Sequence, residues 1–184
     1  GSMKLNDMIR LDGAVSFGKW KFDGDADGLY TEYDEETPKQ TSYTYTLDGL
    51  FVGDQPQTAY VLGTTLTPMD GLRLQGIFKM YDKNYADWSP DSRELSGDAD
   101  RSQVWQAPAY NRLDLHAAYK LPKIAGYDMT LTGHLFNALD AVYVQDAVDN
   151  SQYNGFGDKL HLAHNAEVFL GTPRYFNLGL TVNF

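Results

Sequence analysis

The chain has no cysteine among its 184 residues. This absence excludes disulfide bonds, thiolate catalysis and thiolate metal sites, and it is compatible with a secreted or envelope protein. The sequence also lacks any run approaching the roughly 18 apolar residues of a membrane-spanning helix, which excludes a helical membrane protein. Clusters of Lys and Arg are missing too, and the net charge is −10. These two features argue against nucleic acid and anionic lipid headgroups as partners.

What the chain does contain is typical of many strands and turns. It has 17 Gly, 13 Tyr and 9 Phe, residue types that favour turns or strands. The mean hydropathy of −0.45 resembles that of a water-soluble protein. However, a membrane β-barrel has only alternate residues facing lipid, so hydropathy does not decide between the two classes.

The last eleven residues alternate strictly between apolar and polar or small side chains. In an extended chain the apolar ones share one side. They are Phe176, Leu178, Leu180, Val182 and Phe184. A membrane-spanning β-strand needs roughly 9 to 11 residues with an apolar face toward lipid. The segment therefore predicts the closing strand of an outer-membrane β-barrel, and its apolar row is expected to act as the assembly signal.

Five further segments alternate in the same way, so the sequence predicts six spanning strands of an all-β, antiparallel, up-and-down transmembrane β-barrel portion. Short turns alternate with long connections between them, as in outer-membrane barrels, whose periplasmic turns are short and whose extracellular loops are long. The first long connection is expected to hold an additional hairpin. The other five strands are predicted at 8–22, 58–66, 72–83, 110–121 and 127–139, and the hairpin arms at 29–33 and 42–47.

Placing the apolar rows of neighbouring strands on one face predicts how two pairs of strands align across the short turns. Pairing Leu66 with Leu72 keeps both rows on one face. Pairing Leu121 with Tyr127 is expected to place Lys120 beside Asp128, and Asp114 beside His134.

Two segments carry a family resemblance. Residues 131–143, LTGHLFNALDAVY, look like the penultimate strand of TonB-dependent outer-membrane receptors, in which Asn-Leu-Phe-Asp and a following Tyr close the strand. Here Ala138 and Leu139 stand at the two middle positions. Residues 171–184, GTPRYFNLGLTVNF, are similar to the final strand of that family. Segments 52–58, 81–86 and 105–114 resemble receptors of this type from Bacteroidetes-like bacteria.

The resemblance implies that residues 4–184 are the C-terminal segment of a 22-stranded barrel, preceded by an expression scar at residues 1–3. It implies a Gram-negative outer-membrane importer of a scarce nutrient, such as siderophore-bound iron or a glycan, and no enzymatic activity. Its partners would be outer-membrane lipid, the substrate, and the TonB energy-coupling system acting through an N-terminal part. Two alternatives remain: a small self-contained structural or adhesive outer-membrane barrel, and a soluble ligand-binding β-barrel.

One acidic stretch copies the spacing of a calcium-binding loop. Acids stand at positions one, three, five and twelve of the loop, with Gly28 at position six. The candidate ligands of this Ca²⁺ site are Asp23, Asp25, Asp27 and Asp34. The alternative interpretation is an acidic, Gly-rich extracellular turn. No other cofactor is expected.

Trp88 and Trp105 are expected near the outer ends of the strands, together with several Tyr residues. They are candidates for a stacking platform for sugars or siderophores. An aromatic girdle at the lipid interface is the alternative.

Two groups of histidines raise other chemistries. His161 and His164 are three residues apart and share a face only on a helical turn, where they could hold a metal ion. Asp114, His116 and His134 have the residue types of a catalytic cluster, but no matching nucleophile accompanies them. Polar pairs lining the barrel lumen are the alternative for the second group.

Overall fold

The architecture is described from a computed structural model, which covers residues 1–34, 37–89, 93, 101–123, 126–154 and 160–183. The chain is all-β, as predicted, and is dominated by one antiparallel sheet of seven strands. The described residues form no closed barrel. The order across the sheet is β1 (Ser2–Lys4), β2 (Ile9–Phe17), β5 (Thr58–Met69), β6 (Leu72–Asp82), β9 (Tyr110–Lys120), β10 (Asp128–Phe136) and β13 (Tyr175–Asn183).

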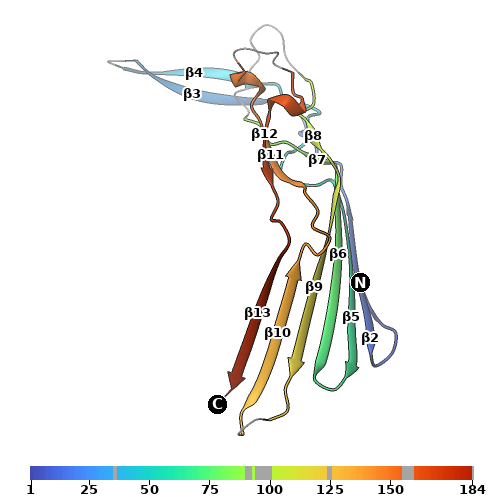
Figure 1. Cartoon of the computed structure of the whole chain (residues 1–184). Helices are drawn as coiled ribbons and strands as arrows, with labels where there is room; N and C mark the ends of the chain where they lie inside the picture. Colours follow the sequence, from blue (N-terminus) through green and yellow to red (C-terminus); the bar gives the residue numbers. More distant parts are fainter. Residues whose placement is uncertain (35–36, 90–92, 94–100, 124–125, 155–159, 184) are drawn as a thin grey trace.

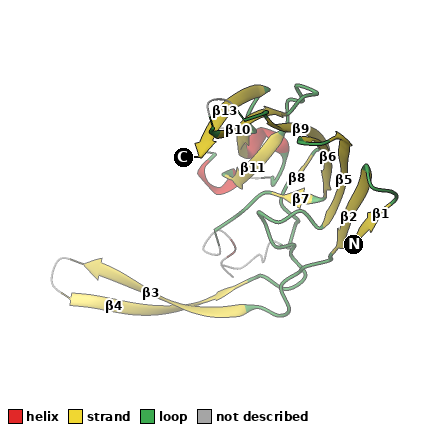
Figure 2. Cartoon of the chain, turned by 90° about the horizontal axis from the view of Figure 1, so that it is seen from below, coloured by secondary structure: helices red, strands yellow, loops and turns green. Residues whose placement is uncertain are grey.

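The six strands expected from the alternation are all present, and β1 is an additional short strand. Figure 1 shows that the long connections gather at one end of the sheet and the short turns at the other. Seen along the strands, the sheet follows an arc (Figure 2). Phe184 lies outside the described residues. No helix in the described part of the chain is long and apolar enough to cross a membrane.

The long connections contain three small antiparallel sheets of two strands each. The expected hairpin is confirmed, and it projects sideways from the loop end (Figure 1). Two short 3₁₀ turns, η2 and η3, complete the loops. The small sheets pair β3 (Ala26–Asp34) with β4 (Thr37–Tyr45), β7 (Asn84–Tyr85) with β8 (Gln106–Ala107), and β11 (Val144–Asp149) with β12 (Ala166–Leu170); the turns are η2 (Ser151–Tyr153) and η3 (Ala163–Asn165).

The predicted register of β5 against β6 is wrong by two residues. Leu66 pairs with Leu74, not with Leu72. The connection is tighter than the alternation suggested: β5 continues to Met69, which pairs with Leu72. A bulge between Leu66 and Met69 takes up one residue, so the shift at Leu66 is two residues and not three. Asp-Gly favours a two-residue hairpin turn because Gly accepts a positive φ, which is 79° at Gly71. An even shift leaves every side chain on its expected face.

The register of β9 against β10 also differs from the prediction by two residues. His134 pairs with His116, so Asp114 does not lie beside His134 as expected. Lys120 pairs with Thr130, yet its Nζ still lies 3.8 Å from Asp128 Oδ1 across the diagonal.

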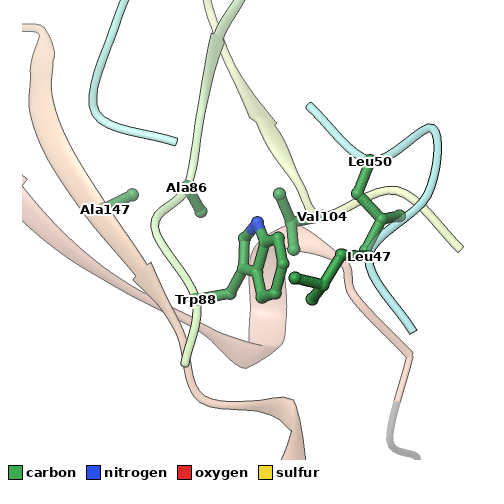
Figure 3. Close-up of a cluster of buried hydrophobic side chains, with 6 residues drawn as sticks. All are labelled: Leu47, Leu50, Ala86, Trp88, Val104 and Ala147. Carbon is green, nitrogen blue, oxygen red and sulfur yellow. The ribbon is translucent and has the colours of Figure 1, made fainter. Parts of the chain in front are cut away.

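The buried apolar cluster of the described residues lies in the loops, not against the sheet. Its six members come from three of the long connections, and five of them lie around the sixth, Trp88 (Figure 3). They are Leu47, Leu50, Ala86, Trp88, Val104 and Ala147. The loop end therefore has a small core of its own, whereas the large sheet has none.

The large sheet ends on edges that are largely unpaired. β13 pairs only with β10, and β1 covers β2 only at Arg10, Leu11 and Asp12. We expect about half of the β13 backbone amides to point away from β10 and to exchange hydrogen quickly, because an edge strand leaves alternate N–H groups without a partner. Amides of β9, which has a neighbour on both sides, should exchange slowly.

Hydrogen exchange of the chain in detergent micelles, resolved by residue, checks this expectation. β5 is a matched control, since it also has two neighbours. Equal protection of β13 and β9 would mean that the edge has found a partner strand, and would contradict the open sheet.

Candidate functional site

One face of the seven-stranded sheet carries an extended surface of apolar side chains, which we call the apolar face. We define it as the face bearing Val15, Leu62, Phe78, Leu115, Leu131 and Leu180, and the residues in phase with them on the same six strands. Cross-strand pairing keeps these rows aligned from β2 to β13.

Side chains of this face are open to the surroundings. Leu62 is 62% exposed, and Phe176 and Leu178 are each 73% exposed. Nine residues at about 3.3 Å each and six strands about 4.8 Å apart give a surface of roughly 30 by 24 Å, on the order of 700 Å². Monomeric soluble proteins rarely expose a contiguous apolar patch of more than a few hundred Å².

The opposite face of the sheet is mostly polar. It carries Asp12, Gln75, His116 and Thr132 with the residues in phase with them. Toward the loop end it holds a buried carboxylate, Asp114, which is 1% exposed.

Asp114 is held by three donors. Lys79 Nζ lies 3.0 Å and Arg112 Nη2 lies 3.3 Å from its Oδ2, and the backbone N–H of Asn137 donates to its Oδ1 at 3.0 Å. A buried carboxylate is tolerated only when it is paired and hydrogen-bonded in this way. These contacts connect strands β6 and β9 to the start of the last long connection.

The two segments that carry the family resemblance meet at the sheet rim. We call this contact the rim clasp and define it by Asn137, Asp140, Tyr143, Gly171 and Arg174. The Asn137 side chain donates to the carbonyls of Ala141 at 2.9 Å and Thr172 at 3.2 Å. Arg174 binds Asp140 through its backbone N–H at 3.2 Å and its guanidinium at 3.4 Å.

An aromatic stack completes the rim clasp. The rings of Tyr143 and Tyr110 stack with centroids 4.4 Å apart, and Arg112 donates to the Tyr143 hydroxyl at 2.9 Å. Gly171 donates its N–H to the Tyr143 carbonyl at 2.9 Å. It lies so close to the Tyr143 ring that an added Cβ would overlap the ring at Cζ, so the position favours glycine. Sequence spacing gave no sign of these contacts, because the segments are about 30 residues apart.

The four residues of the expected calcium loop are not brought together. β3 is extended from Ala26 to Asp34, which separates Asp27 from Asp34 by about 23 Å along the strand. Asp25 instead binds the Arg101 guanidinium at 2.8 Å and accepts backbone N–H groups from Leu47 and Asp48.

In this structure Asp25 is bound by protein donors, and a calcium site at Asp23, Asp25, Asp27 and Asp34 stays a prediction. Hydrogen bonds from Arg101 and from the Asp48 backbone lower the pKa of Asp25 to about 2. The described residues contain no group of three or more His, Cys, Asp or Glu side chains able to hold a metal ion.

The two tryptophans belong to the loop core. Trp88 is 7% exposed, with Phe22 edge-on at 5.4 Å, and Trp105 packs against the same cluster. The Trp88 ring, buried in this way, has no open face for a sugar or siderophore. The stacking platform therefore does not form at Trp88.

A buried polar group that the spacing did not predict lies between β11 and η3. His161 Nδ1 lies 2.6 Å from Asp149 Oδ2 and 2.9 Å from Ser151 Oγ. In a catalytic triad the acid and the nucleophile use opposite ring nitrogens, so this shared nitrogen indicates a structural tie. Burial acts to raise the pKa of Asp149, but hydrogen bonds from His161 and Ser151 outweigh it and lower the pKa. His164 is exposed.

Three carboxylates from separate loops approach each other at the loop end. Partial burial, a hydrogen bond with Asp146 and the negative charges of Asp87 and Asp146 raise the pKa of Asp54 to about 6. Asp54 also has a positive φ of 60°.

No protein-family model matches the chain, and no curated protein matches its sequence.

The close contact in the rim clasp predicts the effect of one methyl group. We expect Gly171→Ala to destabilise the fold by about 1 to 3 kcal/mol, because the added Cβ forces the packed Tyr143 ring to move. Gly13→Ala is the control, since its Cβ would meet its nearest neighbour at an ordinary 3.8 Å. Thermal unfolding in detergent, followed by circular dichroism, compares the two variants. A Gly171→Ala midpoint no lower than that of Gly13→Ala would contradict the packing described for the rim clasp.

Proposed function

We propose that this chain forms the C-terminal wall of a TonB-dependent-type importer barrel in the bacterial outer membrane. The observation that carries the proposal is the apolar face, which spans six strands, stays in register across all of them and is covered by no described residue. In water this surface promotes aggregation, whereas in a bilayer it contacts hydrocarbon.

The dimensions of the sheet fit a bilayer. A strand of nine residues tilted by about 40° covers about 23 Å along the membrane normal, close to the roughly 25 Å apolar band of outer-membrane barrels. The polar face would line the barrel lumen. The end with the long connections would be extracellular, and the end with the short turns periplasmic.

The open edges favour an incomplete barrel over a self-contained one. Unpaired backbone groups are costly inside lipid, so membrane sheets close on themselves. β13 and most of β2 lack a neighbour on one side among the described residues. In the proposed parent protein the missing strands would pair with both edges.

The rim clasp supports the family assignment. The residues on which the resemblance rests, from Asn137 to Tyr143 and from Gly171 to Arg174, contact one another instead of lying apart. They link the last two strands where both meet the loops. Transport itself would require the rest of the barrel and an energy-coupling part, and the nutrient would be selected by surfaces of the complete importer.

Charge placed on the two faces of β13 tests the proposal. We expect Leu180→Arg to abolish outer-membrane assembly of the parent importer, because an arginine facing lipid near the bilayer midplane costs about 2 to 4 kcal/mol. The neighbouring Thr181→Arg is the matched control. It puts the same side chain on the polar face and should assemble at near-normal levels.

The measurement is the amount of folded, heat-modifiable protein in outer-membrane fractions. Equal assembly of the two variants would mean that Leu180 does not face lipid, and the proposal would fail.

A further inference from the structure

A row of polar side chains crosses four adjacent strands of the polar face. Gln75 on β6 pairs with His116 on β9, His116 pairs with His134 on β10, and His134 pairs with Asn177 on β13. Each member stands directly opposite the next. The two imidazoles therefore occupy the centre of the row, with a carboxamide on either side.

The two histidines contact each other through equivalent nitrogens. His116 Nδ1 lies 2.8 Å from His134 Nδ1, and the ring centroids are 5.0 Å apart at an interplanar angle of 62°. A neutral pair at this distance shares a single Nδ1 proton, because two N–H groups would point at each other. The pair thus presents two ring nitrogens to one small volume of space.

The surroundings give this volume a shape and access to solvent. A groove of about 350 Å³ lies over the pair, lined by Arg73, Gln75 and Phe136 among others. The Phe136 ring lies 5.5 Å from the His116 ring and 6.0 Å from the His134 ring. Tyr175 stacks on the far side of Phe136 at 4.7 Å, which fixes that wall of the groove.

We infer that His116 and His134 form a two-nitrogen chelate for Cu²⁺ or Ni²⁺ on the polar face. Imidazole suits these ions, and both favour square-planar or tetragonal sites with N and O ligands. Two ligands at about 2.0 Å and 90° from a metal ion are about 2.8 Å apart, whereas tetrahedral Zn²⁺ requires about 3.3 Å. The Nδ1–Nδ1 separation of 2.8 Å, set in this structure by the hydrogen bond between the rings, equals the ligand spacing of the first arrangement.

Binding changes the tautomer of one ring and turns the rings so that both Nδ1 lone pairs point at the ion and no longer at each other. The shared proton moves from Nδ1 to Nε2, both Nδ1 lone pairs then bind the ion, and no net proton is released from the neutral pair. Gln75 and Asn177 offer carboxamide oxygens beside the pair, and water from the groove completes the coordination. This site is additional to the proposed function and does not rest on it.

The test is a titration of the purified full chain in detergent micelles with CuCl₂, and separately with NiCl₂, followed by calorimetry. We expect one equivalent of ion to bind. His116→Gln and His134→Gln should each weaken binding by more than about tenfold, since even loss of a residue that only orients a ligand costs roughly 10- to 100-fold. His164→Gln is the matched control, because His164 is exposed and lies in the loops.

Paramagnetic resonance of the Cu²⁺-loaded unsubstituted chain gives a readout that does not depend on any variant folding. We expect coupling to two imidazole nitrogens. Unchanged affinity in both histidine variants, a loss caused by His164→Gln, or coupling to fewer than two imidazole nitrogens would overturn the inference.

Discussion

Side chains alternate with a period of two along six antiparallel strands, and this periodicity gathers their apolar residues on one face. No described residue covers that face, and Leu62, Phe176 and Leu178 are each more than half exposed. Fully burying a Leu or Phe side chain contributes about 1.5 to 3 kcal/mol, and the most exposed side chains of this face gain little of that from their own chain. The apolar face is therefore expected to be stable only in contact with hydrocarbon or with another protein surface. The other features of the structure follow from this requirement.

Because the sheet buries no core, the ordered loops depend on contacts of their own. The cluster around Trp88 packs three long connections together. Within the last of these connections, His161 contacts Asp149 and Ser151. Asp114 and the rim clasp then join this loop end to the strands. The sheet is therefore stabilised mainly by backbone pairing between strands, whereas the loop end is stabilised by packing of buried apolar side chains. Such a division suits a wall in lipid with loops in water.

The sequence predicted the parts of this fold that depend on periodicity. Strand positions, loop lengths and the face of each side chain follow from alternation, and an even shift in register leaves the faces unchanged. Both predicted registers were wrong by two residues, and only the one between β5 and β6 involves the short Asp70-Gly71 turn. Features that depend on distant segments could not be found this way. Asp25 pairs with Arg101, and Trp88 is buried in the loop core, and local spacing predicts neither contact. The sequence placed His116 and His134 on neighbouring strands but did not predict that they pair directly.

The central claim is that the apolar face of the sheet contacts lipid. The absence of cysteine allows spin labels at single introduced cysteines along β10, whose two neighbours hold it in place. In phospholipid vesicles, labels at Leu131 and Leu135 should collide with oxygen, which concentrates in the bilayer. Labels at Thr130 and Thr132 should collide with a water-soluble nickel complex. Equal accessibility at all four positions, or the opposite alternation, would contradict the claim.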